Sequence, residues 1–219
     1  MVLMTLGAAY GEGRTILKFQ PMVYGQPLRL EEGTPARDSI RVQLLRFYIS
    51  QLSLFSKGET VWTDSRPGYL LDAEHSSTML LELKAPANIR FDALRFMIGI
   101  DSATNAAGIG SGDLDPAKGM YWAWQSGYIN MKLEGTSPVC KTRKNLFQFH
   151  LGGFLNGDEA AQWITLPAGE GNQHTVEIDI SQFLSQLDLA TQNTVMIPGR
   201  EAVDLSKKMT QAFRVRSAQ

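Results

Sequence analysis

The strongest constraint on the fold is an alternation of apolar and polar residues with a period of two. Such alternation is typical of β-strands that bury one face, because successive side chains point to opposite faces. The runs that carry the pattern are Thr15–Phe19, Ile40–Ile49, Thr78–Leu83, Leu94–Ile100, Ile129–Leu133 and Val176–Ile180. Clusters of Gly, Pro, Asn and Asp lie between them. We therefore expect an all-β protein, a β-sandwich of the immunoglobulin-like or Greek-key type.

Two details refine this expectation. Apolar residues occupy positions 40, 42 and 44 and then 45, 47 and 49, and this slip of one residue predicts a bulge or a bend between two strands. Helix signals are confined to the C-terminal third. Ser181 is suited to cap one short helix, and Pro198-Gly-Arg opens a second one with Val203, Met209 and Phe213 on or near one stripe.

Composition excludes several classes of protein. The chain has 219 residues, of which 43% are hydrophobic and 20% charged, and a net charge of -1. A near-neutral chain has no electrostatic reason to bind nucleic acid, and no apolar run approaches the roughly 18 residues of a membrane span. Residues 1–13 are expected to be a signal-peptide remnant or a disordered start, and residues 14–219 a single domain. The apolar start ending in small residues favours an extracytoplasmic protein.

Enzyme signatures are missing from the sequence. It contains no Gly-x-Ser-x-Gly elbow, its only cysteine is Cys140, and its three histidines lack short metal-binding spacing. No nucleophile–base pair suggests itself. We therefore expect a binding protein rather than an enzyme.

Oxygen-bearing side chains gather in one loop, at Asp101, Asn105, Asp113 and Asp115. Calcium takes oxygen ligands of this kind, so the loop is a candidate calcium site, although its spacing is not that of an EF-hand. Asx turns and helix caps use the same residues, and this structural alternative is the stronger one.

Two further segments carry the candidate site. In Leu146–Gly153, a strand would place Phe147, Phe149 and Leu151 on one face and His150 on the other, with Gly152-Gly153 allowing another group to approach closely. Met120–Tyr128 packs four aromatic residues and a thioether into nine positions. It fits either a buried core strand or a stacking platform for a sugar or a base.

These segments resemble the MbnP-like family of periplasmic copper-associated proteins, first known from methanobactin operons. The resemblance runs from about Thr15 to about Ile180 and rests on four motifs: Gly119-Met-Tyr-Trp-Ala-Trp-Gln-Ser-Gly-Tyr-Ile-Asn-Met-Lys-Leu-Glu-Gly135, Phe149-His-Leu-Gly-Gly153, Arg46-Phe-Tyr-Ile-Ser50 and Phe96-Met-Ile-Gly-Ile-Asp101. A branch of the relatives carries four cysteines, and any role of those cysteines does not transfer to this chain.

The resemblance implies an exported β-sandwich encoded beside a dihaem oxidase of the MbnH or MauG type, which oxidises a tryptophan to kynurenine. It further implies copper, as Cu(I), held by His150, a modified Trp122 or Trp124, and Met120, with His75 as a second imidazole. A copper-transport partner would follow from a role in copper acquisition or handling. The alternative hypothesis is an extracytoplasmic β-sandwich that binds a carbohydrate or a protein through its aromatic strand.

Overall fold

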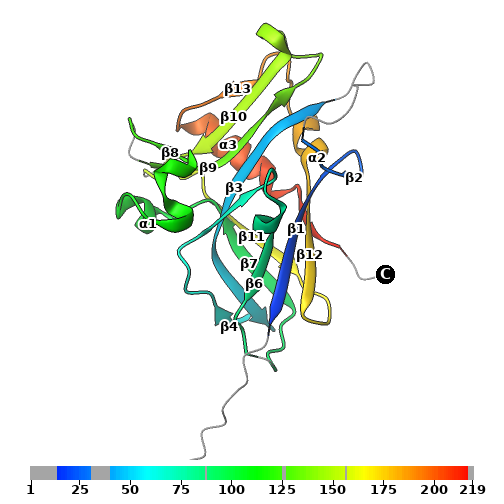
Figure 1. The fold of residues 1–219 in the computed structure, drawn as a ribbon, viewed down its shortest axis with the longest axis vertical. Helices are drawn as coiled ribbons and strands as arrows, with labels where there is room; N and C mark the ends of the chain where they lie inside the picture. The colour runs from blue at the N-terminus through cyan, green and yellow to red at the C-terminus, as the bar shows by residue number, and fades with distance from the viewer. Residues whose placement is uncertain (1–13, 31–39, 87, 125–126, 156, 217–219) are drawn as a thin grey trace, which may run out of the picture.

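The computed structural model describes residues 14–30, 40–86, 88–124, 127–155 and 157–216. Residues 1–13, for which a leader remnant or a disordered start is expected, lie outside these ranges. Figure 1 shows long strands running along the molecule, with helices both behind them and at the margins. No helix among the described residues is long and apolar enough to cross a membrane.

The larger sheet has nine strands and carries the candidate site. Its hydrogen-bonded order is β11-β7-β3-β9-β10-β13, while β4 and β5 pair with β3 and β8 pairs with β9. The strands are β3 (Arg41–Ser56), β4 (Glu59–Thr63), β5 (Tyr69–Asp72), β7 (Ala93–Ile98), β8 (Tyr121–Trp122), β9 (Gly127–Thr136), β10 (Leu146–Gly152), β11 (Gln162–Pro167) and β13 (Thr194–Val195).

The smaller sheet has five strands in the order β14-β12-β1-β2, with β6 also paired to β1. They are β1 (Thr15–Val23), β2 (Gln26–Pro27), β6 (Leu80–Leu83), β12 (Gln173–Asp179) and β14 (Phe213–Val215). Among the described strands, β1–β12 and β10–β13 are the parallel pairs. Apolar side chains from both sheets form one core, in which Phe19 and Phe213 each contact Phe96 edge-on or tilted. The predicted all-β sandwich is confirmed.

The predicted slip in the alternation is a true bulge inside one strand. β3 is continuous over 16 residues, and its register against β9 shifts between Val42 and Leu44. A second shift, against β7, lies between Ser50 and Ser53, where Gln51 has a φ of 51°. Bulges of this kind bend and twist a long strand, which lets β3 pair with β9 at one end and with β7 and β4 at the other.

The helices differ in detail from the prediction. α2 (Ile180–Ser185) is capped by Asp179, which accepts a hydrogen bond from the Gln182 amide, so the prediction of a Ser181 cap is wrong by two residues. α3 (Arg200–Thr210) begins as expected after Pro198-Gly199, but Phe213 lies beyond it in β14. Helical turns also occur before the C-terminal third, at α1 (Ser102–Ala106), η1 (Ser76–Met79), η2 (Gly112–Leu114), η3 (Pro116–Lys118) and η4 (Arg143–Asn145). These turns are too short to leave a periodic signal, and α1 and η3 are stabilised by side-chain caps.

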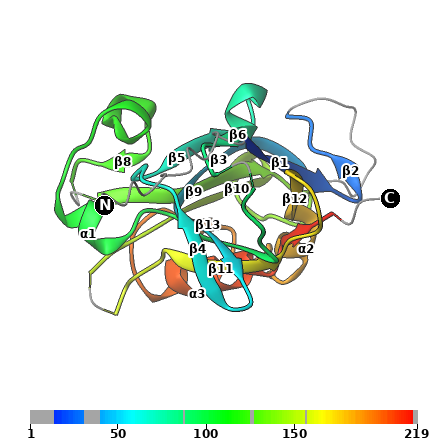
Figure 2. The same ribbon diagram turned by 90° about the horizontal axis from the view of Figure 1, so that it is seen from below.

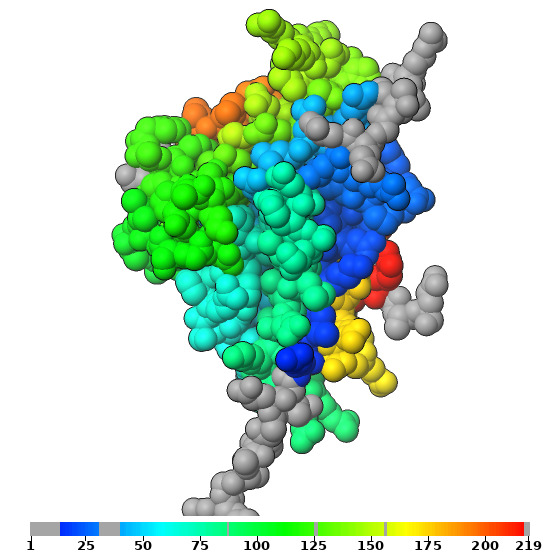
Figure 3. Space-filling view, in the orientation of Figure 1, coloured from blue at the N-terminus to red at the C-terminus, as the bar shows by residue number. Residues whose placement is uncertain are grey.

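α1 and the loop that follows it lie beside β8 on one flank of the sandwich, a placement visible in both ribbon views (Figures 1 and 2). In the space-filling view this part of the chain, drawn in green, forms a lobe at one side of the molecule (Figure 3). The aromatic run therefore sits where the lobe meets the sheet.

Protonation of His174 should destabilise the fold. This imidazole lies in β12 against the Phe91 ring, at 5.1 Å between centroids, and its Nε2 has no hydrogen-bond partner among the described residues. Burial lowers the pKa of His174. The unfolded chain therefore binds a proton at a higher pH than the folded chain does. Stability is complete above the ordinary imidazole pKa of about 6.5 and falls as the pH drops through it.

Thermal melts from about pH 7.5 to about pH 5 should show this loss, and His174→Leu should make the melting temperature less dependent on pH. A variant that keeps the whole pH dependence of the wild type would contradict the assignment.

Candidate metal centre

The indole of Trp122 packs directly on the backbone of Gly152. β8 pairs Trp122 with Gly127 of β9, and this short hairpin lays the ring across the end of β10. A Cβ atom at Gly152 would lie 2.7 Å from Trp122 Cζ3 and 3.1 Å from Trp122 Cη2. The sequence predicted that Gly152 admits a close approach, and the approaching groups are the Trp122 ring and the Tyr128 carbonyl oxygen, which would also lie 2.7 Å from a Cβ there.

His150 lies on the same face of β10 as this contact. Phe147, Phe149 and Leu151 point into the core, as the alternation predicted. Gly152 follows His150 by two residues, and the register between β9 and β10 shifts between Leu151 and Gly152. The Trp122 ring of β8 thus lies against β10 two residues beyond His150. This is the pairing on which the copper hypothesis depends.

A carboxylate orients the imidazole. His150 Nε2 lies 2.6 Å from Glu134 Oε1, which reaches across from β9. Burial lowers the pKa of His150 and outweighs the opposite effect of this hydrogen bond. The neutral imidazole therefore donates its Nε2–H to Glu134 and keeps the lone pair on Nδ1. Carboxylates hold metal-binding histidines in this manner.

Glu134 is not among the candidate residues that the sequence motifs indicate. A usable signal existed, because Lys132 and Glu134 alternate with apolar neighbours and so point outward from the strand that follows the aromatic run. What the signal lacked was the register, which sets Lys132 opposite His150 and so brings Glu134 within reach.

The two tryptophans are not equivalent. Trp122 is 7% exposed, whereas Trp124, beyond the end of β8, is 63% exposed. Their ring centroids are 5.9 Å apart and the planes are tilted by 49°. Trp122 also lines a pocket together with Phe154, Leu155 and Pro198. Of the two indoles, Trp122 is thus the one held beside a small cavity and near His150.

Met120 is completely buried. It shares an apolar cluster with Trp122, Tyr48, Leu114 and Tyr128. Cys140 is also buried, and burial raises the pKa of its thiol, which keeps it in the unreactive protonated form.

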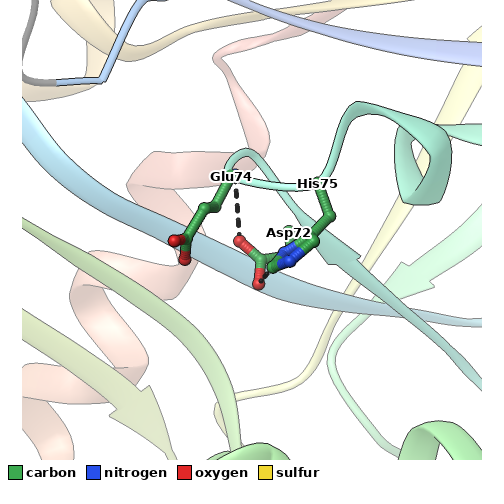
Figure 4. Close-up of side chains that lie close together, drawn as sticks. All are labelled: Asp72, Glu74 and His75. Carbon is green, nitrogen blue, oxygen red and sulfur yellow. Dashed lines mark hydrogen bonds and ion pairs between the residues drawn. The ribbon is translucent and has the colours of Figure 1, made fainter.

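His75 belongs to a different cluster, which Figure 4 shows with Asp72 and Glu74. Its Nδ1 lies 3.3 Å from Asp72 Oδ2. Arg46 already pairs with this group, with Nε 2.7 Å from Asp72 and Nη2 3.1 Å from Glu74. A guanidinium so placed supplies the positive charge that a metal would otherwise provide.

The structure does not bring His75 to His150. In the register of the sheet, Asp72 of β5 lies opposite Arg46 of β3, Arg46 opposite Lys132 of β9, and Lys132 opposite His150 of β10. Three strand spacings separate the two ends by about 14 Å. Lys132 lies between the two clusters, and its pKa is lowered by burial and by Arg46, with Glu134 opposing.

The acidic loop uses its oxygens for structure. Asp101 caps α1 by accepting from the Thr104 amide and hydroxyl, and Asp115 caps η3 by accepting from the Ala117 amide. Asp113 forms an ion pair with Arg66 at 3.1 Å. Asn105 donates to the Ile100 carbonyl and accepts from the Tyr128 amide. This geometry favours the structural alternative over a calcium site.

Two buried tyrosines fasten this loop to the sheet. Tyr48 donates to the Asp113 carbonyl at 2.9 Å, and Tyr128 donates to the Leu114 carbonyl at 3.0 Å while accepting from the Gly110 amide. Their rings contact edge-on, with centroids 5.8 Å apart. Because β8 follows this loop directly, the tyrosines help to fix where Trp122 enters the site.

These features define a class: a β-sandwich in which a short aromatic hairpin lies over a histidine-bearing strand of the larger sheet. The family model for MbnP matches residues 12–197, and the chain belongs to the MbnP family.

Among solved structures, MbnP from Methylosinus trichosporium is similar, with a TM-score of 0.60 and 14% sequence identity over 82% of this chain and 80% of that chain. At this identity the match supports the fold alone. The search of curated proteins finds no match.

Replacing Gly152 by alanine should displace the Trp122 ring, since the new methyl group would overlap its benzo edge. We expect a loss of about 1–3 kcal/mol in the free energy of unfolding. Tryptophan fluorescence should shift to the red as the indole becomes hydrated. Gly169→Ala is the matched control, because a Cβ there meets open space. An unchanged fluorescence spectrum and unchanged stability in Gly152→Ala would contradict the packing.

Proposed function

We propose that this chain is a periplasmic copper-binding protein of the MbnP family, without turnover of its own, that acts in copper acquisition or handling. Its Trp122 would be converted to kynurenine by a dihaem oxidase of the MbnH or MauG type, and a copper-transport partner would exchange metal with it. The observation that supports the proposal is the contact of the Trp122 ring with Gly152, which follows His150 by two residues in β10.

The donor set supports copper only after modification. His150 offers a neutral Nδ1 backed by Glu134, and imidazole suits copper. An unmodified indole has only an N–H donor and cannot act as a ligand. Opening the ring to kynurenine creates an aryl amine and a ketone at the same position. The copper cargo would then be held between this group and His150.

The geometry favours Trp122 over Trp124 as the modified residue. Trp122 borders a small pocket, and its ring lies on Gly152, two residues from His150 in β10. Trp124 is mostly in solvent. A ligand formed there would lack a fixed protein partner and would exchange readily with water.

One observation supports the alternative function. A tryptophan that is 63% exposed is a common platform for stacking a sugar. A carbohydrate ligand would then depend on Trp124 and not on His150, and glycan-array binding abolished by Trp124→Ala but retained in His150→Ala would favour this function.

Copper binding should depend on His150 and its carboxylate. Protein produced together with its oxidase should hold one copper per chain after desalting, measured by elemental mass spectrometry. His150→Ala should lose the metal, and Glu134→Gln should weaken affinity by about 10–100-fold because the imidazole loses its orienting partner. His75→Ala is the control and should retain copper, since His75 lies in the separate Arg46 cluster. Full occupancy in His150→Ala would overturn the assignment.

Peptide mass spectrometry of the same preparation should locate the modification. Fragment ions should place the mass change of tryptophan-to-kynurenine conversion on Trp122 and leave Trp124 intact. A change on Trp124 alone would show that exposure, rather than proximity to His150, selects the residue. An unmodified peptide would remove the oxidase from the proposal.

A further inference from the structure

Trp122, the residue proposed to be oxidised, is the buried one of the tryptophan pair, and Trp124 is the exposed one. The oxidant of a partner protein therefore has to reach a buried ring. Trp122 is 7% exposed, lies against Gly152 and belongs to the apolar cluster that includes Met120 and Tyr128. An oxidant held inside another protein cannot come into contact with such a ring. Trp124 is 63% exposed, and its ring centroid lies 5.9 Å from that of Trp122.

We propose that Trp124 is an electron relay, through which Trp122 is oxidised by the haem of its partner. The inference rests on the proposed function, which supplies the oxidant: the partner's haem, oxidised by hydrogen peroxide. In each relay step the Trp124 indole loses one electron to the haem. It then regains one electron from Trp122. The net change is one electron moved from Trp122 to the haem, with Trp124 unchanged and the indole N–H proton of Trp122 released to water.

The two buried tyrosines of the adjacent cluster are poor competitors for this oxidation. Oxidation of a phenol at neutral pH requires loss of its proton to a base. Tyr48 and Tyr128 donate their hydroxyl protons to the carbonyl oxygens of Asp113 and Leu114, which are not bases. Burial raises the pKa of both phenols. An indole gives up an electron before it loses its proton, so the oxidation proceeds through the Trp122–Trp124 pair and the N–H proton of Trp122 leaves afterwards.

Another exposed tryptophan provides a contrast. Trp163 on β11 is 46% exposed, but its ring lies under the Arg95 guanidinium, 4.3 Å from the centroid. A fixed positive charge at this distance disfavours a radical cation on the indole. Trp163 is therefore a matched control. It is a tryptophan of similar exposure, but the described ring contacts join Trp122 to Trp124 and not to Trp163.

The test compares the rate of kynurenine formation at Trp122 in wild type, Trp124→Phe, Trp124→Tyr and Trp163→Phe. Each protein is treated with the dihaem oxidase and hydrogen peroxide and then analysed by peptide mass spectrometry. Trp124→Phe should slow the reaction by about an order of magnitude or more, because phenylalanine is not oxidised under these conditions. Trp124→Tyr should recover much of the rate, since an exposed tyrosine can pass its proton to water. Trp163→Phe should react like the wild type.

A second oxidant separates the relay from docking of the partner. Tris(bipyridine)ruthenium(III), generated by a laser flash, takes one electron from accessible side chains without a protein interface. Oxidation at Trp122 should again fall in Trp124→Phe and recover in Trp124→Tyr. Equal Trp122 oxidation in wild type and Trp124→Phe with both oxidants would overturn the relay.

Failure of the proposed function and failure of the relay give different results in these experiments. If the wild type with its oxidase forms no kynurenine at Trp122, the proposed function fails, whatever the ruthenium arm gives. If the wild type is modified and Trp124→Tyr is as slow as Trp124→Phe, Trp124 serves only as a contact for the partner, and the relay is wrong.

Discussion

The contact between the Trp122 ring and the bare backbone of Gly152 is the constraint on which the candidate site depends. An indole can lie this close to a strand only where no side chain stands in the way, and Gly152 is the outward position next to His150. The same contact removes Trp122 from solvent and holds its edge against a pocket. The absence of a side chain at Gly152 thus accounts for the burial of Trp122, for its limited access to solvent and for its position two residues from His150 along β10.

The rest of the flank holds this contact in place. Asp101 and Asp115 cap short helical turns, Tyr48 and Tyr128 bind the loop carbonyls, and Asn105 accepts from the Tyr128 amide at the base of β9. These residues give the acidic loop a structural role. The outer face of the larger sheet also divides its charges into two groups. Arg46 neutralises the carboxylates near His75, whereas Glu134 is left to orient His150.

The sequence predicted best what depends on local periodicity. The two faces of β10, the bulge in β3 and the close approach at Gly152 all follow from alternation and from glycine chemistry. Prediction failed where the answer depends on pairing between distant segments. Glu134 meets His150, and His75 is separated from it, only because β9 lies between β3 and β10. The ends of elements were also uncertain: Asp179 rather than Ser181 caps α2, and Phe213 belongs to a strand. The unequal exposure of Trp122 and Trp124 arises because β8 ends after two residues.

We propose that Trp122 and His150 form one copper site on the outer face of β10. The decisive measurement is anomalous diffraction at the copper absorption edge, from crystals of protein produced with its oxidase. We expect a peak within bonding distance of His150 Nδ1 and next to an opened ring at position 122, with Nε2 still hydrogen-bonded to Glu134. A peak instead among Asp72, Glu74 and His75, or beside an intact Trp122, would contradict it.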